Sequence, residues 1–175
     1  MSQKERKTKK SIAVSIYADE FVKLIQHTYK EHHRLAFLLA YGSGLRVSEV
    51  VKLEPRDVDL KERKILIREG KGGKDRIVPL PKGFKEKHLL LLPMKCGVRS
   101  LQVAFHDACK RAGLLNTKPT LHFHSLRHGF GYRCVNEGIP IHNVRTLMGH
   151  TNISTTNVYL EANPKDALKS YEELF

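Results

Sequence analysis

The chain has 175 residues, of which 41% are hydrophobic, so it is long and apolar enough to form one domain with its own core. It contains no apolar run that approaches the roughly 20 residues of a membrane span. Lysine and arginine total 31 against 18 acidic residues, and the formal net charge of +13 indicates a polyanionic partner, with nucleic acid the leading candidate.

Residues 1–15 form a basic N-terminal segment that we expect to be flexible. It carries five cationic side chains and no apolar stretch behind them, which excludes a secretory signal. The five cations are Lys4, Arg6, Lys7, Lys9 and Lys10. We expect one folded domain over residues 16–175.

The next part of the chain has the spacing of helices. Apolar residues recur at intervals of three and four, and a glycine pair interrupts the pattern. The predicted elements are a helix from Asp19 that faces inward through Phe21, Leu24, Ile25 and Tyr29, a helix over Leu35–Tyr41 broken by Gly42-Ser43-Gly44, a short helix over Arg46–Leu53 and a turn over Pro55–Asp59.

The spacing of apolar residues then changes from that of helices to that of strands. Residues 64–68 and 76–80 predict two strands, and the glycine-rich residues 69–75 between them predict a β-hairpin. Pro79 and Pro81 place the end of the second strand, or an edge, at this point.

The remainder of the chain is predicted to be helical, so the fold class is mostly α with a small antiparallel β-sheet, an α+β domain. The predicted helices are one capped by Ser100 that runs to Arg111 and is ended by Gly113, one over Phe123–Asn136, one from Pro140 to Met148 closed by Gly149, a short one capped by Ser154 that carries Tyr159, and an amphipathic one from Pro164 with Ala167, Leu168, Tyr171 and Leu174.

The cysteines and histidines do not form a zinc motif. Cys96, Cys109 and Cys134 are odd in number and far apart, which favours a reducing, cytoplasmic compartment over a disulfide framework. The histidines at 122, 124 and 128 have no cysteine or carboxylate at zincin spacing. We therefore predict no functional metal site and no cofactor.

Four short segments carry residue types with chemical potential, although each alone is weak evidence. A helix arginine is usually a solvated charge, a glycine-loop lysine is usually part of a turn, and a single tyrosine is more often core than nucleophile. The loop also lacks the spacing of a phosphate-binding P-loop. The segments are GLRVSE at 44–49, GKGGKDR at 70–76, HSLRH at 124–128 and MGH at 148–150, the last followed nine residues later by Tyr159.

In kind, order and spacing these segments resemble the tyrosine recombinases, the family of Xer proteins and phage integrases. GLRVSE resembles the first arginine box, GKGGKDRIVPLP the hairpin lysine segment, HSLRH the His-x-x-Arg box, and MGHTNISTTNVY the glycine-histidine box that leads to the tyrosine. The resemblance covers nearly the whole chain after residue 15, and it implies the catalytic-domain fold of that family. It also implies an enzyme that cleaves and rejoins double-stranded DNA through a 3′-phosphotyrosine without a cofactor.

The resemblance assigns a role to each candidate residue. Two guanidinium groups suit the charge that builds on a phosphate, and a tyrosine needs a neighbour to accept its proton. The implied set is Arg46 and Arg127 on the phosphate, His150 as a further donor, Tyr159 as nucleophile, His124 as proton acceptor, Lys71 as the acid that protonates the leaving 5′ oxygen, Glu49 as a support for Arg46, and Lys74, Arg76 and His128 as DNA contacts.

The chain departs from the family at its start. Most tyrosine recombinases carry a helical core-binding domain before the catalytic domain, and we expect that domain to be absent here. Binding would then rest on half of the usual clamp, with self-association on DNA through the C-terminal helix from Pro164 to Leu174 as one possible aid. We expect location with the nucleoid and no association with a membrane.

Three other functions were weighed. A non-catalytic DNA-binding integrase remnant is disfavoured by the complete set of six catalytic candidates. A ribosomal-type RNA binder is disfavoured because aromatic residues make up only 7% and tryptophan is absent. DNA relaxation like that of a type IB topoisomerase remains open, because the active sites are similar.

Overall fold

The structure is a computed structural model that describes residues 14–68 and 75–149. The predicted hairpin loop and the two predicted helices after residue 150 lie outside these ranges. In the described ranges no helix has the length and apolar character needed to cross a membrane.

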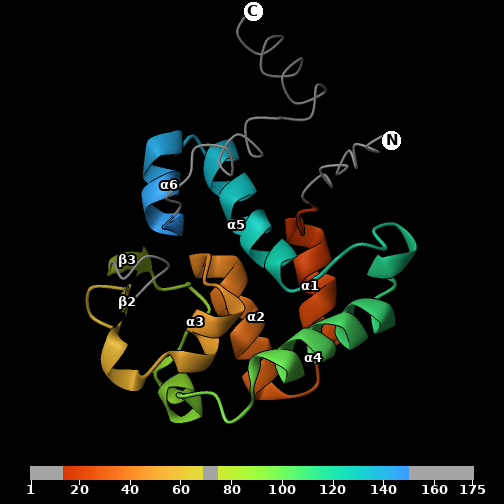
Figure 1. Cartoon of the computed structure of the whole chain (residues 1–175), viewed down its shortest axis with the longest axis horizontal. Helices are drawn as coiled ribbons and strands as arrows, with labels where there is room; N and C mark the ends of the chain where they lie inside the picture. Colours follow the sequence, from red (N-terminus) through yellow and green to blue (C-terminus); the bar gives the residue numbers. More distant parts are fainter. Residues whose placement is uncertain (1–13, 69–74, 150–175) are drawn as a thin grey trace, which may run out of the picture.

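The described residues form a mostly helical domain with one small antiparallel sheet (Figure 1), which confirms the predicted fold class. The α-helices are α1 (Ala18–Gln26), α2 (Glu31–Ser43), α3 (Val47–Lys52), α4 (Val98–Arg111), α5 (His124–Asn136) and α6 (Ile141–Met148). Short 3₁₀ helices are η1 (Pro55–Asp57), η2 (Glu86–Leu91) and η3 (Leu114–Asn116), and the strands are β1 (Val58–Asp59), β2 (Lys64–Ile67) and β3 (Arg76–Pro79).

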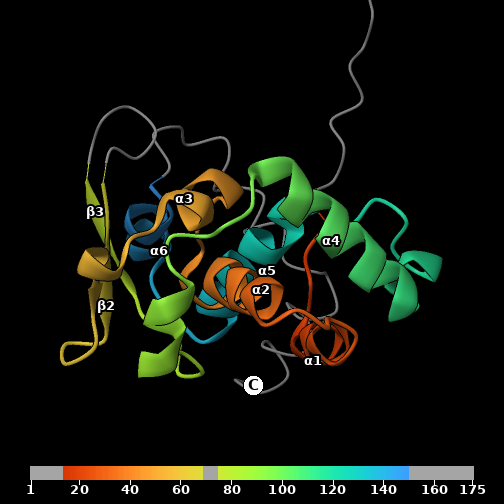
Figure 2. The same ribbon diagram turned by 90° about the horizontal axis from the view of Figure 1, so that it is seen from below.

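Helix α2 lies at the centre of the domain, between α5 on one side and α3 and α4 on the other (Figures 1 and 2). Apolar residues occupy most of its circumference, as expected of a helix surrounded by protein. Phe37 is fully buried and its ring meets the rings of Phe105 and Phe123 edge-on, at centroid distances of 5.6 and 5.9 Å. The core therefore joins α2 to α4 and to the start of α5.

The sheet lies beside this core and has the strand order β1-β2-β3, with both pairs antiparallel (Figure 2). Ile65 pairs with Val78, and both side chains are buried, whereas Ile77 on the opposite face is 56% exposed. The pairing of β2 with β3 confirms the two strands predicted on either side of the glycine-rich residues 69–75. Strand β1 replaces the end of the turn predicted over Pro55–Asp59, because a two-residue strand is too short to show alternation.

Three local predictions were wrong in detail. Helix α1 ends at Gln26, and Tyr29 lies beyond it, 71% exposed, beneath the Arg111 guanidinium. Gly97, not Ser100, is the N-cap of α4, because extended backbone at a glycine can begin a helix without a capping side chain. Helix α2 continues through Gly42 and ends only at Gly44, where φ is +69°.

Candidate active site

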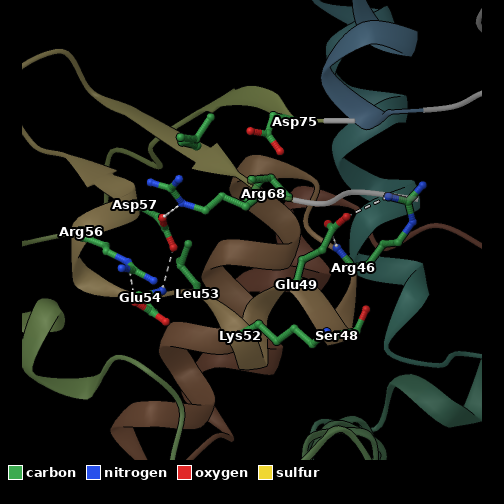
Figure 3. Close-up of a pocket in the computed structure, with 12 residues that line it drawn as sticks. Arg46, Ser48, Glu49, Lys52, Leu53, Glu54, Arg56, Asp57, Arg68 and Asp75 are labelled. Atoms are coloured by element: carbon green, nitrogen blue, oxygen red, sulfur yellow. Dashed lines mark hydrogen bonds and ion pairs between the residues drawn. The ribbon is translucent and has the colours of Figure 1, made fainter. Parts of the chain in front are cut away.

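Arg46 and Glu49 meet at the start of α3. Arg46 is the N-cap residue, and its backbone N–H donates to Glu49 Oε2 at 2.7 Å. Its guanidinium Nη1 donates to Glu49 Oε1 at 2.8 Å (Figure 3). One carboxylate therefore holds both the backbone and the side chain of Arg46.

Arg76, the first residue of β3, holds the same carboxylate. Its Nη1 and Nη2 donate to Glu49 Oε1 and Oε2 at 2.8 and 2.7 Å. Its Nε donates to the carbonyl oxygen of Leu147 in α6 at 3.0 Å, and the side chain is only 8% exposed. Arg76 thus ties the sheet to α3 and α6. This geometry differs from the predicted DNA contact, since the guanidinium is turned inward.

The carboxyl group of Glu49 is ionised at physiological pH. Burial alone would raise its pKa, but hydrogen bonds from Arg76 and Arg46 outweigh burial and lower the pKa to about 2. A carboxyl with that pKa does not exchange protons near neutrality. Glu49 therefore orients its arginine partners and does not act as a general acid or base.

The C-terminal end of α6 is bound by arginines from three other elements. The last carbonyl groups of a helix lack partners within the helix and form the negative end of its dipole, so they attract cations. The contacts are Arg76 Nε to Leu147 O at 3.0 Å, Arg127 Nη2 to Met148 O, and Arg46 Nη2 to Gly149 O at 3.2 Å. Arg46 and Arg127 thus reach two successive carbonyl groups, immediately before residue 150 in the sequence.

Arg127 comes from α5 and is only 1% exposed, which is rare for a charged side chain. Its Nη1 donates to the carbonyl oxygen of Gly44 at the end of α2. Gly44 needs to be glycine twice over, because φ is +69° and a Cβ would lie 2.5 Å from Cδ1 of Phe130. The carbonyl oxygen of Gly44 accepts a hydrogen bond from one terminal nitrogen of the Arg127 guanidinium, and the carbonyl oxygen of Met148 accepts one from the other.

His124 and His128 lie one turn apart on α5 with their rings in contact, edge to face at a centroid distance of 4.7 Å. His122 lies 6.3 and 6.5 Å from the two rings. Burial, followed by the neighbouring His124 and His122, lowers the pKa of His128 to about 4. His128 is thus a neutral, partly buried ring against His124, a position unlike that of a cationic DNA contact.

An open pocket of about 780 Å³ extends from Arg46 and Glu49 along the sheet (Figure 3). Arg46 and Glu49 lie at one end, and an ion pair between Arg68 Nε and Asp57 Oδ1, 2.7 Å long, lies at the other. Basic side chains of Lys52 and Arg56 also line it. The pocket offers both cations and carboxylates around the arginine that is expected to bind phosphate.

The structure thus brings together four of the expected residues, Arg46, Glu49, Arg76 and Arg127, and places His124 beside His128. Lys71, Lys74, His150 and Tyr159 lie outside the described residues. The bridging role of Arg76 was missed by sequence reasoning. No local pattern could have revealed it, because its partner Glu49 lies 27 residues earlier on another element.

Comparison with known proteins identifies the family of this chain. The model of the phage integrase family matches residues 14–90 and 82–166. The tyrosine recombinase XerA of Thermococcus kodakarensis is 34% identical over 158 residues, which cover 82% of this chain and 56% of that protein. XerC of Staphylococcus carnosus is 30% identical over 180 residues, covering 89% and 59%. The chain therefore spans somewhat more than half the length of these relatives.

Solved structures show the same fold. The crystal structure of XerA recombinase has a TM-score of 0.72 and 25% identity, covering 93% of this chain and 66% of that one. The XerH site-specific recombinase bound to a palindromic difH substrate has a TM-score of 0.73 at 22% identity, covering 91% and 53%. With the arginine cluster, the matched segments and the shared fold in place, this chain belongs to the phage integrase family.

Proposed function

We propose that this chain is a site-specific DNA recombinase that cleaves and rejoins strands through a 3′-phosphotyrosine at Tyr159. One observation carries the proposal: the guanidinium groups of Arg46 and Arg127, from different helices, reach successive carbonyls at the end of α6. Planar guanidinium forks match phosphate oxygens in geometry and charge. The similarity to XerA and XerH supports the choice of reaction.

In the proposed reaction the Tyr159 hydroxyl oxygen attacks the phosphorus and the bond to the 5′ oxygen breaks. The tyrosine proton passes to His124, and Lys71 protonates the departing 5′ oxygen. Arg46, Arg127 and His150 stabilise the charge on the nonbridging oxygens. A 5′ hydroxyl then attacks the phosphotyrosine and restores a phosphodiester. The number of phosphate ester bonds is conserved, so no nucleotide is consumed.

The protein's own contribution to this step is placement. Backbone carbonyls of Gly44 and of the end of α6 hold Arg127. Glu49, which is hydrogen-bonded to Arg76, holds Arg46. His128 packs against His124 as a neutral ring and limits its orientation. Preorganised donors of this kind contribute typically about 3–4 kcal/mol each to transition-state stabilisation.

We also propose the substrate, the assembly on DNA and the location of the protein in the cell. We propose double-stranded DNA as the substrate, and self-association on it through the segment from Pro164 to Leu174, which the sequence predicts to be helical. The solved dimer of lambda integrase on a COC′ core site supports such an assembly. The basic charge and three free cysteines favour the cytoplasm and the nucleoid. The recombinase relatives do not favour the alternative of DNA relaxation like that of a type IB topoisomerase.

The test is trapping of the covalent adduct on a nicked suicide duplex that carries a family-type palindromic site, in EDTA and without nucleotide. We expect the wild-type chain to form a protein–DNA adduct, and Tyr159→Phe to form none while it retains noncovalent binding. Tyr132→Phe, a change on α5 next to Tyr17, is the matched control and should form the adduct normally.

Adduct formation by Tyr159→Phe would refute the assignment and direct attention to Tyr132 and Tyr171. A requirement for added Mg²⁺ would instead indicate a nuclease. Relaxation of supercoiled DNA without exchange of strands between two sites would favour the topoisomerase-like function.

A further inference from the structure

A second cluster of side chains lies at the opposite end of α2 from the active site. His32 and His33 belong to the first turn of α2, and Cys96 lies in the segment between η2 and α4. One candidate donor atom from each, an imidazole nitrogen or the sulfur, lies within 4.8 Å of the others. All three residues are partly buried, so their donor atoms are held in place and remain reachable from solvent.

We propose that His32, His33 and Cys96 bind one divalent ion of the zinc class. Two imidazoles and one thiolate form a borderline-soft donor set, which selects Zn²⁺ over the oxygen-seeking Mg²⁺ and Ca²⁺. With ligand bonds of about 2.0–2.3 Å, tetrahedral donors lie roughly 3.3–3.8 Å apart. The donor atoms, which lie within 4.8 Å of one another, would have to move closer on binding.

The donor atoms have no competing partners in the described residues. The imidazoles of His32 and His33 contact each other, with centroids 4.3 Å apart, and the His33 ring also packs on Phe37. Within residues 14–68 and 75–149, the imidazole rings of His32 and His33 make no side-chain hydrogen bond, and the Cys96 thiol makes none either. A metal would therefore replace no existing protein interaction.

The neighbouring charges define the coordination. Glu31 pairs with Lys87, with 2.6 Å between Oε1 and Nζ, and is not one of the three clustered donors. The site then has three protein ligands and one open position for water. The thiolate offsets part of the ion's charge, which matters because Lys30 precedes the cluster and repels cations.

Such an ion would join the start of α2 to the segment that leads into α4, closing a long loop of the chain. Restricting a long loop in the unfolded chain stabilises the folded state. The site is also separate from catalysis, because Gly44 follows His32 by 12 positions, a rise of about 18 Å along the helix. The proposed site is therefore distinct from the arginine cluster of the active site.

The experiment is a Co²⁺ and Zn²⁺ titration of the full chain without a polyhistidine tag. Co²⁺ reports its ligands, because a thiolate ligand adds a sulfur-to-cobalt charge-transfer band to the visible bands of a tetrahedral site. We expect one equivalent with this band, displaced by Zn²⁺, and a rise in melting temperature. Cys96→Ser should lose the band, and His33→Gln should weaken binding at least about tenfold, the loss typical for even an outer-shell partner.

Controls separate this site from other histidines. His106→Gln, an exposed histidine on α4, should bind Co²⁺ like the wild type. The cluster of His122, His124 and His128 contains no sulfur, so binding there would give no thiolate band. Zn²⁺ should also slow alkylation of Cys96, read by mass spectrometry, relative to the buried Cys109 and Cys134.

The proposal is overturned by a spectrum without a thiolate band, by a band that survives in Cys96→Ser, or by alkylation of Cys96 at an unchanged rate with Zn²⁺. If Cys96→Ser does not fold, His33→Gln and the alkylation rate decide the question. Adduct formation on DNA should be unaffected by Cys96→Ser, so failure of the metal site leaves the proposed recombinase function standing.

Discussion

Glu49 and Arg76 form a two-point ion pair in which both carboxylate oxygens face both terminal guanidinium nitrogens, at 2.8 and 2.7 Å. The two side chains are 9% and 8% exposed, so the pair is largely removed from water. The same carboxylate holds Arg46, so the sheet and the arginine expected to bind phosphate share one anchor. The position of Arg46 therefore depends on a residue of β3.

Replacing Arg76 by lysine tests this dependence. A lysine keeps the charge but loses the two-point geometry, so Arg46 would be held less firmly. We expect the rate of adduct formation to fall about a hundredfold, the usual result of a displacement of about 1 Å at a catalytic group, with little change in DNA affinity. Rates and affinities would be measured on the same suicide duplex. Arg56→Lys, on an exposed side chain, is the matched control.

Two further measurements separate positioning from a direct DNA contact. Arg76→Lys and Glu49→Gln should have non-additive effects on the cleavage rate, because both disturb the same anchor. A fall in DNA affinity as large as the fall in rate, with additive effects, would show that Arg76 contacts DNA as the sequence first suggested.

Helices and strands that are encoded by local periodicity could be predicted from the sequence. Features that depend on contacts between distant residues were missed. The alternation through Ile65, Ile67 and Val78 identified the hairpin, and Gly149 identified the end of α6. Strand β1 was missed because its two residues take their conformation from pairing with β2. The role of Arg76 was missed because the charge partner that withdraws it from the surface lies on α3.

The contacts of the arginine cluster in the site could not be predicted from the sequence for the same reason. Resemblance named Arg46 and Arg127, but nothing in either segment shows that both bind the carbonyls that end α6. Those contacts exist because helix ends leave carbonyl groups without partners, and only the folded arrangement determines which cations reach them.

The depressed pKa of His128 predicts a loss of stability in mild acid. Its pKa of about 4 lies below the 6.5 of an unperturbed histidine, so between these values the unfolded chain binds the proton and the folded chain does not. The stability from neutral His128 is complete above about pH 6.5 and is lost as the pH falls towards 4, by at most about 3 kcal/mol.

Urea unfolding at about pH 7.5 and about pH 5.5 measures this effect. We expect His128→Gln to be less sensitive to the change in pH than the wild type, by about 1 kcal/mol in the free energy of unfolding. His142→Gln, at an exposed histidine, should match the wild type at both pH values. Equal pH sensitivity of His128→Gln and wild type would contradict the depressed pKa.

Lys71 is expected to protonate the leaving 5′ oxygen, although it lies outside the described residues. Lys71→Ala should slow cleavage of ordinary DNA strongly, whereas a 5′-bridging phosphorothiolate, whose sulfur leaving group needs little protonation, should restore it. The same substrate should not rescue Arg46→Ala, because that residue acts on the nonbridging oxygens. Rescue of both variants or of neither would remove Lys71 from the acid role, and Lys74 would be tested next.

The last prediction concerns how the chain holds DNA. With a net charge of +13, we expect binding to rest mainly on phosphate contacts, each of which releases counterions and makes affinity fall with salt. Six to ten such contacts would lower affinity by about a thousandfold or more between about 50 and 200 mM salt. Base edges would be read by few side chains, so a palindromic site and scrambled DNA should bind similarly.

The pocket beside Arg46 allows this prediction to be resolved by residue. Lys52 is exposed on its rim, whereas Arg68 is already paired with Asp57 at 2.7 Å. Lys52→Gln should therefore reduce the slope of log affinity against log salt by about 1, and Arg68→Gln by less, because its charge is partly neutralised before DNA arrives. The measurement is a salt titration of binding to both DNAs for wild type and the two variants. Tight, selective binding that barely changes with salt would show that base readout, not the phosphate backbone, dominates recognition by this chain.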